Sequence, residues 1–414
     1  MALPAVFRAL EAPRYRRYFI GQAISILGTW IQTVAMSWLV YRLTGSAALL
    51  GITAFLAQVP QLVISPVAGT FIDRFDRRKM FLLVQGLMIA QALLLAGLTA
   101  SGLIQTWHLI ALAALFGIIN AMDVPLRQSM LGGLVDDRAH LRNAVALNAS
   151  LFNSARFIGP PMAGLILALT SESVCFALNG LSFLGVAIAV FRLPAQPGSG
   201  GHSNIAAALK EGVGYALASL PIRTLLIGIA AMNVTGSAFM VLMPVLAKDV
   251  FGGDAQTLGW LLGASGGGAL IGTLLVASRP SLCQLVRLVV AGWVLAAINL
   301  AVLAWTGWLW LALIASFGIG MGITSVNVST NAVLQSLSPD RLRGRIISYF
   351  TGFRFGLDAL GGLAAGTLTS HFGIRPTLAG EAILVGLGMI WMAAQSKKVR
   401  TTATRQEREN NALL

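Results

Sequence analysis

The chain has 414 residues, of which 56% are hydrophobic and only 11% are charged, and its mean hydropathy is +0.78. Soluble domains carry about 25% charged residues, so this composition excludes a soluble globular protein and indicates a membrane protein. A formal net charge of +14 would suggest nucleic-acid binding in a soluble chain, but here the basic residues follow a membrane topology.

Apolar stretches long enough to cross a bilayer recur along the whole chain. A transmembrane helix needs about 20 predominantly apolar residues. Twelve stretches meet that length, so we expect an all-α membrane protein with twelve transmembrane helices in two pseudo-symmetric six-helix bundles. Residues 1–16 are too polar for a signal-peptide core, so the first span is expected to remain in the membrane. The expected spans are 17–41, 48–72, 79–101, 107–132, 143–169, 173–192, 222–247, 256–278, 284–305, 308–335, 345–370 and 375–395.

The basic residues predict the orientation of these spans. We take the N-terminus as cytoplasmic and let the spans alternate in direction. Of the 29 basic residues, three then face the outside and three lie within spans, and the other 23 lie on the cytoplasmic side. This positive-inside bias predicts that both termini are cytoplasmic. The six are Arg42, Lys248 and Arg375 outside, and Arg127, Arg156 and Arg354 within spans.

A short, highly charged loop separates the second and third spans. Six charges fall in the seven residues from Asp73 to Lys79. Asp73 is expected near the start of span 11, where a carboxylate close to a helix N-terminus contributes roughly 0.3–1 kcal/mol. Contacts that exist only when the inner side is closed would favour the outward-facing state, which predicts a conformational gate. The alternative is that the basic residues only anchor the loop at the membrane surface. The predicted gate residues are Gly69, Asp73, Arg74, Arg77 and Arg78.

Ionisable residues inside spans are costly in lipid and usually face a cavity or a partner. Asp123 and Arg127 lie four residues apart in span 4 and therefore share one helix face. Arg354 and Asp358 have the same spacing in span 11. The simpler interpretation is a local ion pair in each span. The functional interpretation is a proton site, at which substrate displaces the arginine and competes with the proton. The proton-coupling candidates are Asp123 and Asp358, and the candidate cavity charges are Arg127, Arg156 and Arg354, of which the last two are candidates to attract an anionic substrate.

Span 5 contains the run from Gly159 through Pro160 and Pro161 to Gly164. Proline within a helix removes a backbone donor and bends it, and small residues allow close helix contact. Span 8 is the expected partner and the contact would seal the cavity against leak, although ordinary small-residue packing is an equal alternative. The glycines expected at this contact in span 8 are Gly263, Gly266, Gly267, Gly268 and Gly272.

A long polar stretch divides the chain into two halves. Its Pro- and Gly-rich start predicts a flexible linker, and 204–219 predict an amphipathic helix on the inner surface. Weak repeats support two like-oriented halves: 45–51 enters span 2 and 253–259 enters span 8, at an offset of 208 residues. The predicted domains are an N-terminal bundle at 1–192, a linker at 193–221, a C-terminal bundle at 222–396 and a basic cytoplasmic tail at 397–414.

Polar and soft side chains in the spans are candidates to line a substrate cavity. Most such residues are helix-packing residues or interfacial anchors, so only a minority are expected to touch substrate. Glu381, early in span 12, is interpreted as peripheral. The candidates are Gln32, Met36, Asn120, Asn153, Asn233, Phe239, Met240, Asn327 and Asn331.

The sequence carries no pattern typical of an enzyme. There is no Gly-rich phosphate loop ending in Lys-Ser or Lys-Thr, so no ATP motor is encoded in this chain. The four histidines are scattered, so no metal site is predicted. We expect no cofactor, with a proton gradient as the energy source.

The charged loop resembles motif A of the major facilitator superfamily, and the span 5 run resembles motif C of its exporters. Other segments, namely 30–32, 38–41, 65–66 and 73–78, are similar to the subgroup that contains the enterobactin exporter and macrolide efflux proteins. Ala155 and Ala163 stand where this family often has glycine.

This resemblance implies a secondary active transporter of the bacterial inner membrane that works by alternating access. It implies proton-coupled export of an amphipathic small molecule, either a siderophore or a drug. The alternatives are transport of lysophospholipids or other lipids, uptake by symport, and a receptor or scaffold that has lost transport. The expected partners are a small-molecule substrate and the lipid bilayer, with no nucleic acid, and the protein is expected to be a monomer.

Overall fold

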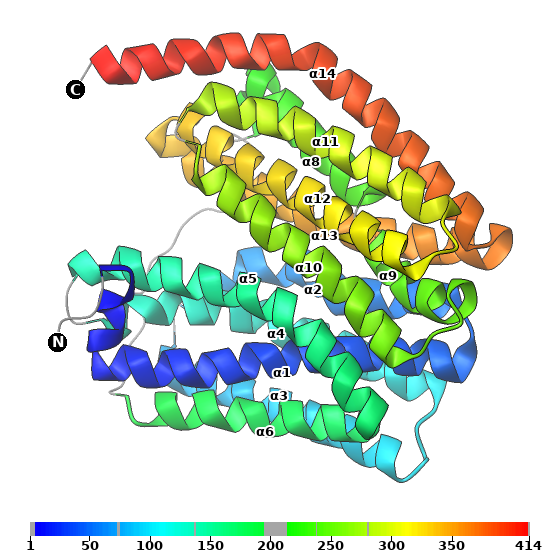
Figure 1. The fold of residues 1–414 in the computed structure, drawn as a ribbon. Helices are drawn as coiled ribbons and strands as arrows, with labels where there is room; N and C mark the ends of the chain where they lie inside the picture. Colours follow the sequence, from blue (N-terminus) through cyan, green and yellow to red (C-terminus); the bar gives the residue numbers. More distant parts are fainter. Residues whose placement is uncertain are drawn as a thin grey trace. The chain divides into compact units, whose positions relative to one another are not determined.

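The computed structural model describes residues 5–72, 75–135, 138–193, 213–236, 238–279 and 281–412. Within these ranges the chain is helical and contains no β-strand. A short 3₁₀ segment, η1 (Ala5–Glu11), precedes the long helices (Figure 1). These are α1 (Pro13–Thr44), α2 (Ala47–Ile72), α3 (Arg77–Ala100), α4 (Thr106–Leu134), α5 (Arg138–Leu169), α6 (Glu172–Phe191), α8 (Leu220–Thr235), α9 (Phe239–Val245), the π-helical η2 (Leu246–Val250), α10 (Ala255–Ala277), α11 (Leu282–Trp305), α12 (Leu309–Leu337), α13 (Asp340–Phe372) and α14 (Ile374–Ala412).

The helices confirm the predicted all-α membrane fold. Ten helical segments of the described chain are long and apolar enough to cross a membrane, when 220–250 is taken as one segment. The helices α5 and α13 are as long, at 32 and 33 residues, but they are more polar because they carry Arg156, Arg354 and Asp358. With these two, the described residues account for all twelve expected spans.

Local sequence signals set several helix boundaries. Pro13 lies in the first turn of α1, where its missing N–H is not needed, and Gly45 ends that helix with φ of 60°. Asp76 caps α3, because its Oδ1 accepts hydrogen bonds from the backbone N–H groups of Arg78 at 2.9 Å and Lys79 at 3.3 Å. One carboxylate of the charged loop therefore fixes where the third span begins.

The seventh span is interrupted, although the sequence predicts one continuous helix over 222–247. The helix α8 ends at Thr235, where the Gly236 N–H bonds to the Met232 carbonyl, and a new helix starts at Phe239. Within the new segment Pro244 cannot donate a backbone hydrogen bond, and a π-helical turn follows it. A discontinuous helix exposes backbone groups in the middle of a span, which is common at transporter binding sites.

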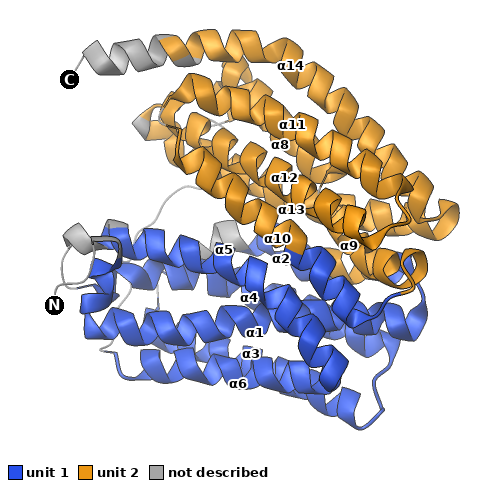
Figure 2. Cartoon of the chain, viewed as in Figure 1, with its two compact units in different colours: residues 1–49, 56–202, 253–263 blue, residues 50–55, 203–252, 264–414 orange. Residues whose placement is uncertain are grey.

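The chain divides into two compact units (Figure 2). Unit 1 comprises 1–49, 56–202 and 253–263, and unit 2 comprises 50–55, 203–252 and 264–414. In unit 1, α1 packs against α6 and α5, and α3 packs against α6 and α4. In unit 2, α11 packs against α12 and α14, and α13 packs against α8.

Two predicted segments fall partly outside the described residues. Of the predicted linker at 193–221, residues 194–212 lie outside the described residues, so the predicted domain boundary stays a prediction. Of the expected amphipathic helix, 213–218 are helical. The predicted basic tail continues α14 as helix as far as Ala412.

Candidate functional site

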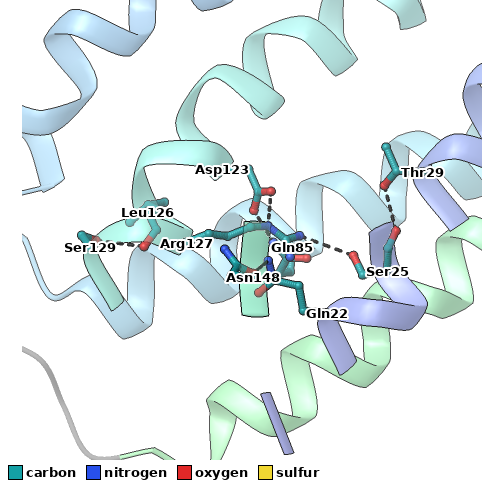
Figure 3. Close-up of polar contacts among 9 residues, drawn as sticks. All are labelled: Gln22, Ser25, Thr29, Gln85, Asp123, Leu126, Arg127, Ser129 and Asn148. Atoms are coloured by element: carbon teal, nitrogen blue, oxygen red, sulfur yellow. Dashed lines mark hydrogen bonds and ion pairs between the residues drawn. The ribbon is translucent and has the colours of Figure 1, made fainter. Parts of the chain in front are cut away.

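The strongest candidate site is a buried ion pair in unit 1. Asp123 and Arg127 on α4 are only 4% and 5% exposed, and the Arg127 Nε donates to the Asp123 Oδ2. Their spacing of one helical turn brings the two side chains together on one face. The local ion pair predicted for span 4 is therefore present. In Figure 3 the two side chains point toward one another.

Side chains from two other helices complete the pair. The Gln85 Nε2 on α3 donates to the Asp123 Oδ1 at 2.6 Å, and the Arg127 Nη2 donates to the Ser25 Oγ on α1 at 3.4 Å (Figure 3). The Arg127 guanidinium also lies over the Phe81 ring, 5.6 Å from its centroid. The carboxylate and the guanidinium are therefore held by three helices in a site that excludes bulk water.

The site retains unused hydrogen-bonding capacity. Gln22 on α1 donates from its Nε2 to the Asn148 Oδ1 on α5 at 2.8 Å (Figure 3). The Oε1 atoms of Gln22 and Gln85 are buried and have no hydrogen-bond partner among the described residues. Buried polar atoms without a partner are rare, and these two acceptors suit a site that binds a water molecule or a hydrogen-bond donor of a ligand.

The chemistry of this arrangement follows from its charge balance. A buried pair is stable while both partners are charged, whereas removing one charge typically costs about 3–5 kcal/mol. Protonation of Asp123 would neutralise the carboxylate and leave Arg127 without its counter-charge. The site can therefore couple the arrival of a proton to the release of a guanidinium group.

A second buried polar network links four helices of unit 1. The Gln32 Nε2 on α1 donates to the Gln91 Oε1 on α3 at 3.1 Å, and the Asn179 Nδ2 on α6 donates to the Gln32 Oε1 at 2.8 Å. Gln91 also donates to the Leu112 carbonyl of α4 at 3.2 Å. Gln32 was singled out as a cavity candidate, and here both ends of its amide hold neighbouring helices.

Sequence reasoning missed several members of these networks. Gln22, Gln85, Gln91 and Asn179 are all buried, and each makes a hydrogen bond to another helix. The available signal was the presence of an amide side chain in an apolar span, because such groups usually face a partner rather than lipid.

The charged pair of span 11 lies in unit 2. Arg354 and Asp358 on α13 are half-buried, and the Arg354 guanidinium lies 5.1 Å from the centroid of the Phe355 ring. The two proton-coupling candidates thus belong to different units, and their roles stay predictions. Arg156 on α5 in unit 1 is also half-buried.

The remaining cavity candidates differ in burial. Met36, Asn120, Asn153, Met240 and Asn331 are half-buried, whereas Asn233, Phe239 and Asn327 are buried. The Asn233 Nδ2 donates to the Asn327 Oδ1 at 3.4 Å, which joins α8 to α12. Contact of any of these residues with substrate stays a prediction.

The gate residues are only partly described. Asp73 and Arg74 lie outside the described residues, and Gly69 falls in the last turn of α2. Arg77 and Arg78 open α3. The Arg78 guanidinium donates to the carbonyl of Phe191 at the end of α6 and lies over the ring of the same residue at 5.3 Å. Arg78 therefore joins α3 to α6, and the expected contact of Asp73 with span 11 stays a prediction.

The glycines of span 5 lie in close helix contacts within unit 1. A Cβ on Gly164 would lie 2.9 Å from the Ala255 carbonyl oxygen, and a Cβ on Gly259 would lie 2.7 Å from the Pro160 oxygen. A Cβ on Gly263 would collide with the Pro161 ring. The first turns of α10 are therefore the partner of α5, as expected from the sequence.

Two glycines expected at this contact lie elsewhere. A Cβ on Gly272 would lie 2.8 Å from the Met321 carbonyl oxygen of α12, and one on Gly268 would collide with the Phe317 carbonyl of the same helix. Both belong to unit 2. The glycines of α10 therefore serve two different contacts, because successive turns of one long helix meet different neighbours.

Comparison with known proteins decides the family. Residues 5–412 match the sequence model of the family MFS_3, described as transmembrane secretion effectors. The chain belongs to this family. It is therefore a multi-pass membrane transporter of the major facilitator superfamily, not an enzyme, and its partners are a small-molecule substrate and the bilayer that surrounds it.

Three relatives named as transporters resemble the chain over most of its length. The multidrug efflux pump Tap of Mycobacterium tuberculosis is 27% identical over 382 residues, which cover 88% of this chain and 89% of that protein. The enterobactin exporter EntS of Shigella boydii is 27% identical over 407 residues, 94% of each chain. The staphyloferrin A transporter of Staphylococcus aureus is 28% identical over 267 residues, 63% of this chain and 66% of that relative.

Solved structures agree on the fold. A bacterial homologue of the lysosomal transporter Spinster, in an inward-facing and occupied conformation, superposes with a TM-score of 0.74 at 13% identity and covers 92% of this chain and 96% of its own. The nucleoside transporter NupG superposes with a TM-score of 0.70 at 12% identity, covering 92% and 98%. The transporter fold is thus shared at identities that carry no information on substrate.

Proposed function

We propose that this transporter exports an amphipathic small molecule, a siderophore or a drug, in exchange for protons by alternating access. The observation that carries the proposal is the buried network of Asp123, Arg127 and Gln85. The relatives, which are transporters of enterobactin, staphyloferrin A or multiple drugs, support the substrate class. The protein works as a monomer in the bacterial inner membrane with both termini in the cytoplasm.

In the proposed cycle, proton and substrate compete for one site. Asp123 carries either a proton or, in place of Arg127, a hydrogen-bond donor or cationic group of the substrate. Protonation of Asp123 removes the charge to which that group binds and displaces the substrate, which is the requirement for antiport. The proton gradient supplies the energy, without an organic cofactor or a metal. Asp358 is the corresponding candidate in unit 2.

Two other elements have proposed roles in this cycle. Asp73 stabilises the outward-facing state at the end of α2, together with the arginines that follow it. The contact between α5 and the first turns of α10 restricts leak, because small residues leave no path between the helices.

The proton role is tested with pH-driven export in cells that express single variants. We expect Asp123→Asn to abolish the response of export to a pH gradient, because asparagine keeps the Gln85 contact but cannot exchange a proton. The matched control is Glu172→Gln, which removes a carboxylate of the same unit that pairs with the Arg42 Nε at 2.7 Å. If Asp123→Asn and Asp358→Asn, singly and together, leave pH-driven export unchanged, the coupling assignment is wrong.

The substrate class is tested by comparing small molecules inside cells and in the medium. A deletion strain and its complemented parent are grown with and without iron. A chelator that accumulates in the mutant and disappears from the medium only under iron limitation supports siderophore export. Greater sensitivity to hydrophobic antibiotics without that shift supports drug efflux. A change in membrane lipids alone would contradict both and favour lipid transport.

A further inference from the structure

A carboxyl group in unit 2 is buried without a partner among the residues that the structure describes. Glu381 on α14 is 7% exposed, although the sequence suggests a peripheral position. Both of its carboxyl oxygens are buried and make no hydrogen bond within the described residues. The other two buried carboxylates of the described residues differ in this respect, because Asp123 pairs with Arg127 and Glu172 pairs with Arg42.

Glu381 lies on the apolar stripe that α14 turns toward the interior of unit 2. Leu378, Val385 and Met392 on the same helix are at most 1% exposed. A Cβ on Gly236, at the break between α8 and α9, would lie 3.6 Å from the Val385 side chain, one turn beyond Glu381. The carboxyl therefore lies on a helix face whose other buried side chains are apolar, close to the seventh span, which is interrupted between α8 and α9.

Among the described residues no side chain forms an ion pair with this carboxyl, and Arg375, the first basic residue of its own helix, is exposed. The helices α9 and α12 carry no ionisable side chain. On the other helices packed against α14 these groups are Arg223 on α8, Cys283 and Arg287 on α11, and Asp340, Arg341, Arg343, Arg345, Tyr349, Arg354, Asp358 and His371 on α13.

From this geometry we propose that Glu381 is a proton-binding site of unit 2, which holds its proton in this conformation and exchanges it when the helices around the α8–α9 break rearrange. An ionised carboxylate without a counter-charge or a donor is far more costly to bury than a neutral carboxyl group. The proton is therefore the ligand that makes this burial possible. The exchange step rests on the proposed proton-coupled transport, whereas occupancy by a proton does not.

Occupancy is tested on the purified wild-type protein with dicyclohexylcarbodiimide, an apolar reagent that requires a protonated carboxyl. The carboxyl proton moves to one reagent nitrogen while the carboxyl oxygen adds to the central carbon. The acyl group then moves from oxygen to nitrogen and leaves a stable N-acylurea, without any oxidation or reduction. Peptide mass spectrometry reports the modified fraction at Glu381 and, as an internal control, at ion-paired Glu172.

We expect modification of Glu381 to exceed that of Glu172 and to fall about tenfold for each pH unit above its titration midpoint. The Glu381→Gln variant should lose this adduct. The infrared band of the protonated Glu381 carboxyl should also be present in the wild type and absent from Glu381→Gln. This second measurement detects the proton even if the reagent does not reach the carboxyl. Modification no greater than at Glu172, together with an unchanged infrared spectrum, would overturn the proposal.

Exchange of the proton is tested by export. Glu381→Gln should flatten the dependence of export on the pH gradient, whereas Glu172→Gln should keep it. An unaltered dependence in Glu381→Gln would overturn the exchange step. Failure of the wild type to export any of the compounds tested would overturn the proposed function instead, and the labelling result would stand by itself.

Discussion

At the scale of single residues, charge inside the membrane is the informative feature of this transporter. Asp123 and Arg127 form a closed pair supported by Gln85, whereas Glu381 has no partner at all among the described residues. The first arrangement stabilises two charges against each other, and the second stabilises a neutral group.

The coupling within the Asp123–Arg127 pair predicts a non-additive response to mutation. Asp123→Asn and Arg127→Gln should each destabilise the protein by about 3–5 kcal/mol, because each leaves one buried charge without its partner. The double variant should cost clearly less than the sum of the two. Denaturant unfolding of the purified proteins in detergent measures all three. Additive costs would show that the two side chains do not depend on each other.

At the scale of elements, helix starts and helix contacts are set by a few side chains. Asp76 fixes the first turn of α3, and glycine fixes how closely α10 approaches α5. Gly51 and Gly259 occupy equivalent positions in the two weak sequence repeats, 208 residues apart. A Cβ on Gly51 would lie 2.9 Å from the Gly362 carbonyl oxygen of α13 in unit 2. Each repeat therefore uses the same position for a close helix contact within one unit.

The cap of α3 predicts a modest loss of stability. Asp76→Ala should lower the free energy of unfolding by about 0.5–2 kcal/mol, because two backbone N–H groups lose their acceptor. Asp76→Asn should retain most of the wild-type stability, since asparagine caps a helix nearly as well as aspartate. Thermal unfolding followed by circular dichroism separates the two variants. Equal losses in both would point to the charge of Asp76 rather than to its cap.

The close contact at Gly259 predicts a steric effect. Gly259→Val should destabilise the protein by about 1–3 kcal/mol, because its branched side chain would overlap the backbone of α5. Gly86→Ala on α3 is the control, since a Cβ there would meet no atom within 4 Å and alanine favours the helix. The same unfolding assay should show a loss for Gly259→Val alone. A stable Gly259→Val protein would mean that the two helices can separate at no cost.

At the scale of the whole molecule, the distribution of charge sets the membrane topology. Twelve long helical segments in the described part of the chain and a strong bias of basic residues predict that both termini lie on one side of the membrane. Phe75 in the loop between α2 and α3 is exposed, and so is Ser101 between α3 and α4. The proposed orientation puts these two positions on opposite sides of the membrane.

That orientation predicts a thiol-labelling pattern in intact cells. In a background with Cys175 and Cys283 replaced by serine, Ser101→Cys should react with an impermeant maleimide from outside. Phe75→Cys should react only after the cells are opened, because its loop faces the cytoplasm. Export by both variants serves as the control for folding. The reverse pattern would place the N-terminus outside and contradict the topology.

The sequence by itself determined the class, the number of spans and the family. These conclusions rest on the length of the apolar stretches, the charge content and the resemblance of two short motifs. All three are properties of consecutive residues, so they can be read without knowledge of how the helices pack. The pairing of Asp123 with Arg127 was also foreseeable, because a spacing of one turn places both side chains on one helix face.

Only the tertiary structure decided which polar groups meet across helices and which remain alone. The donor from Gln85, the Gln32–Gln91–Asn179 network and the division of the α10 glycines between two neighbours depend on residues far apart in the chain. The same holds for Glu381, which a linear reading places near the surface and packing places inside unit 2. Burial and partnership are set by the helices that surround a side chain, and a local pattern does not specify those helices.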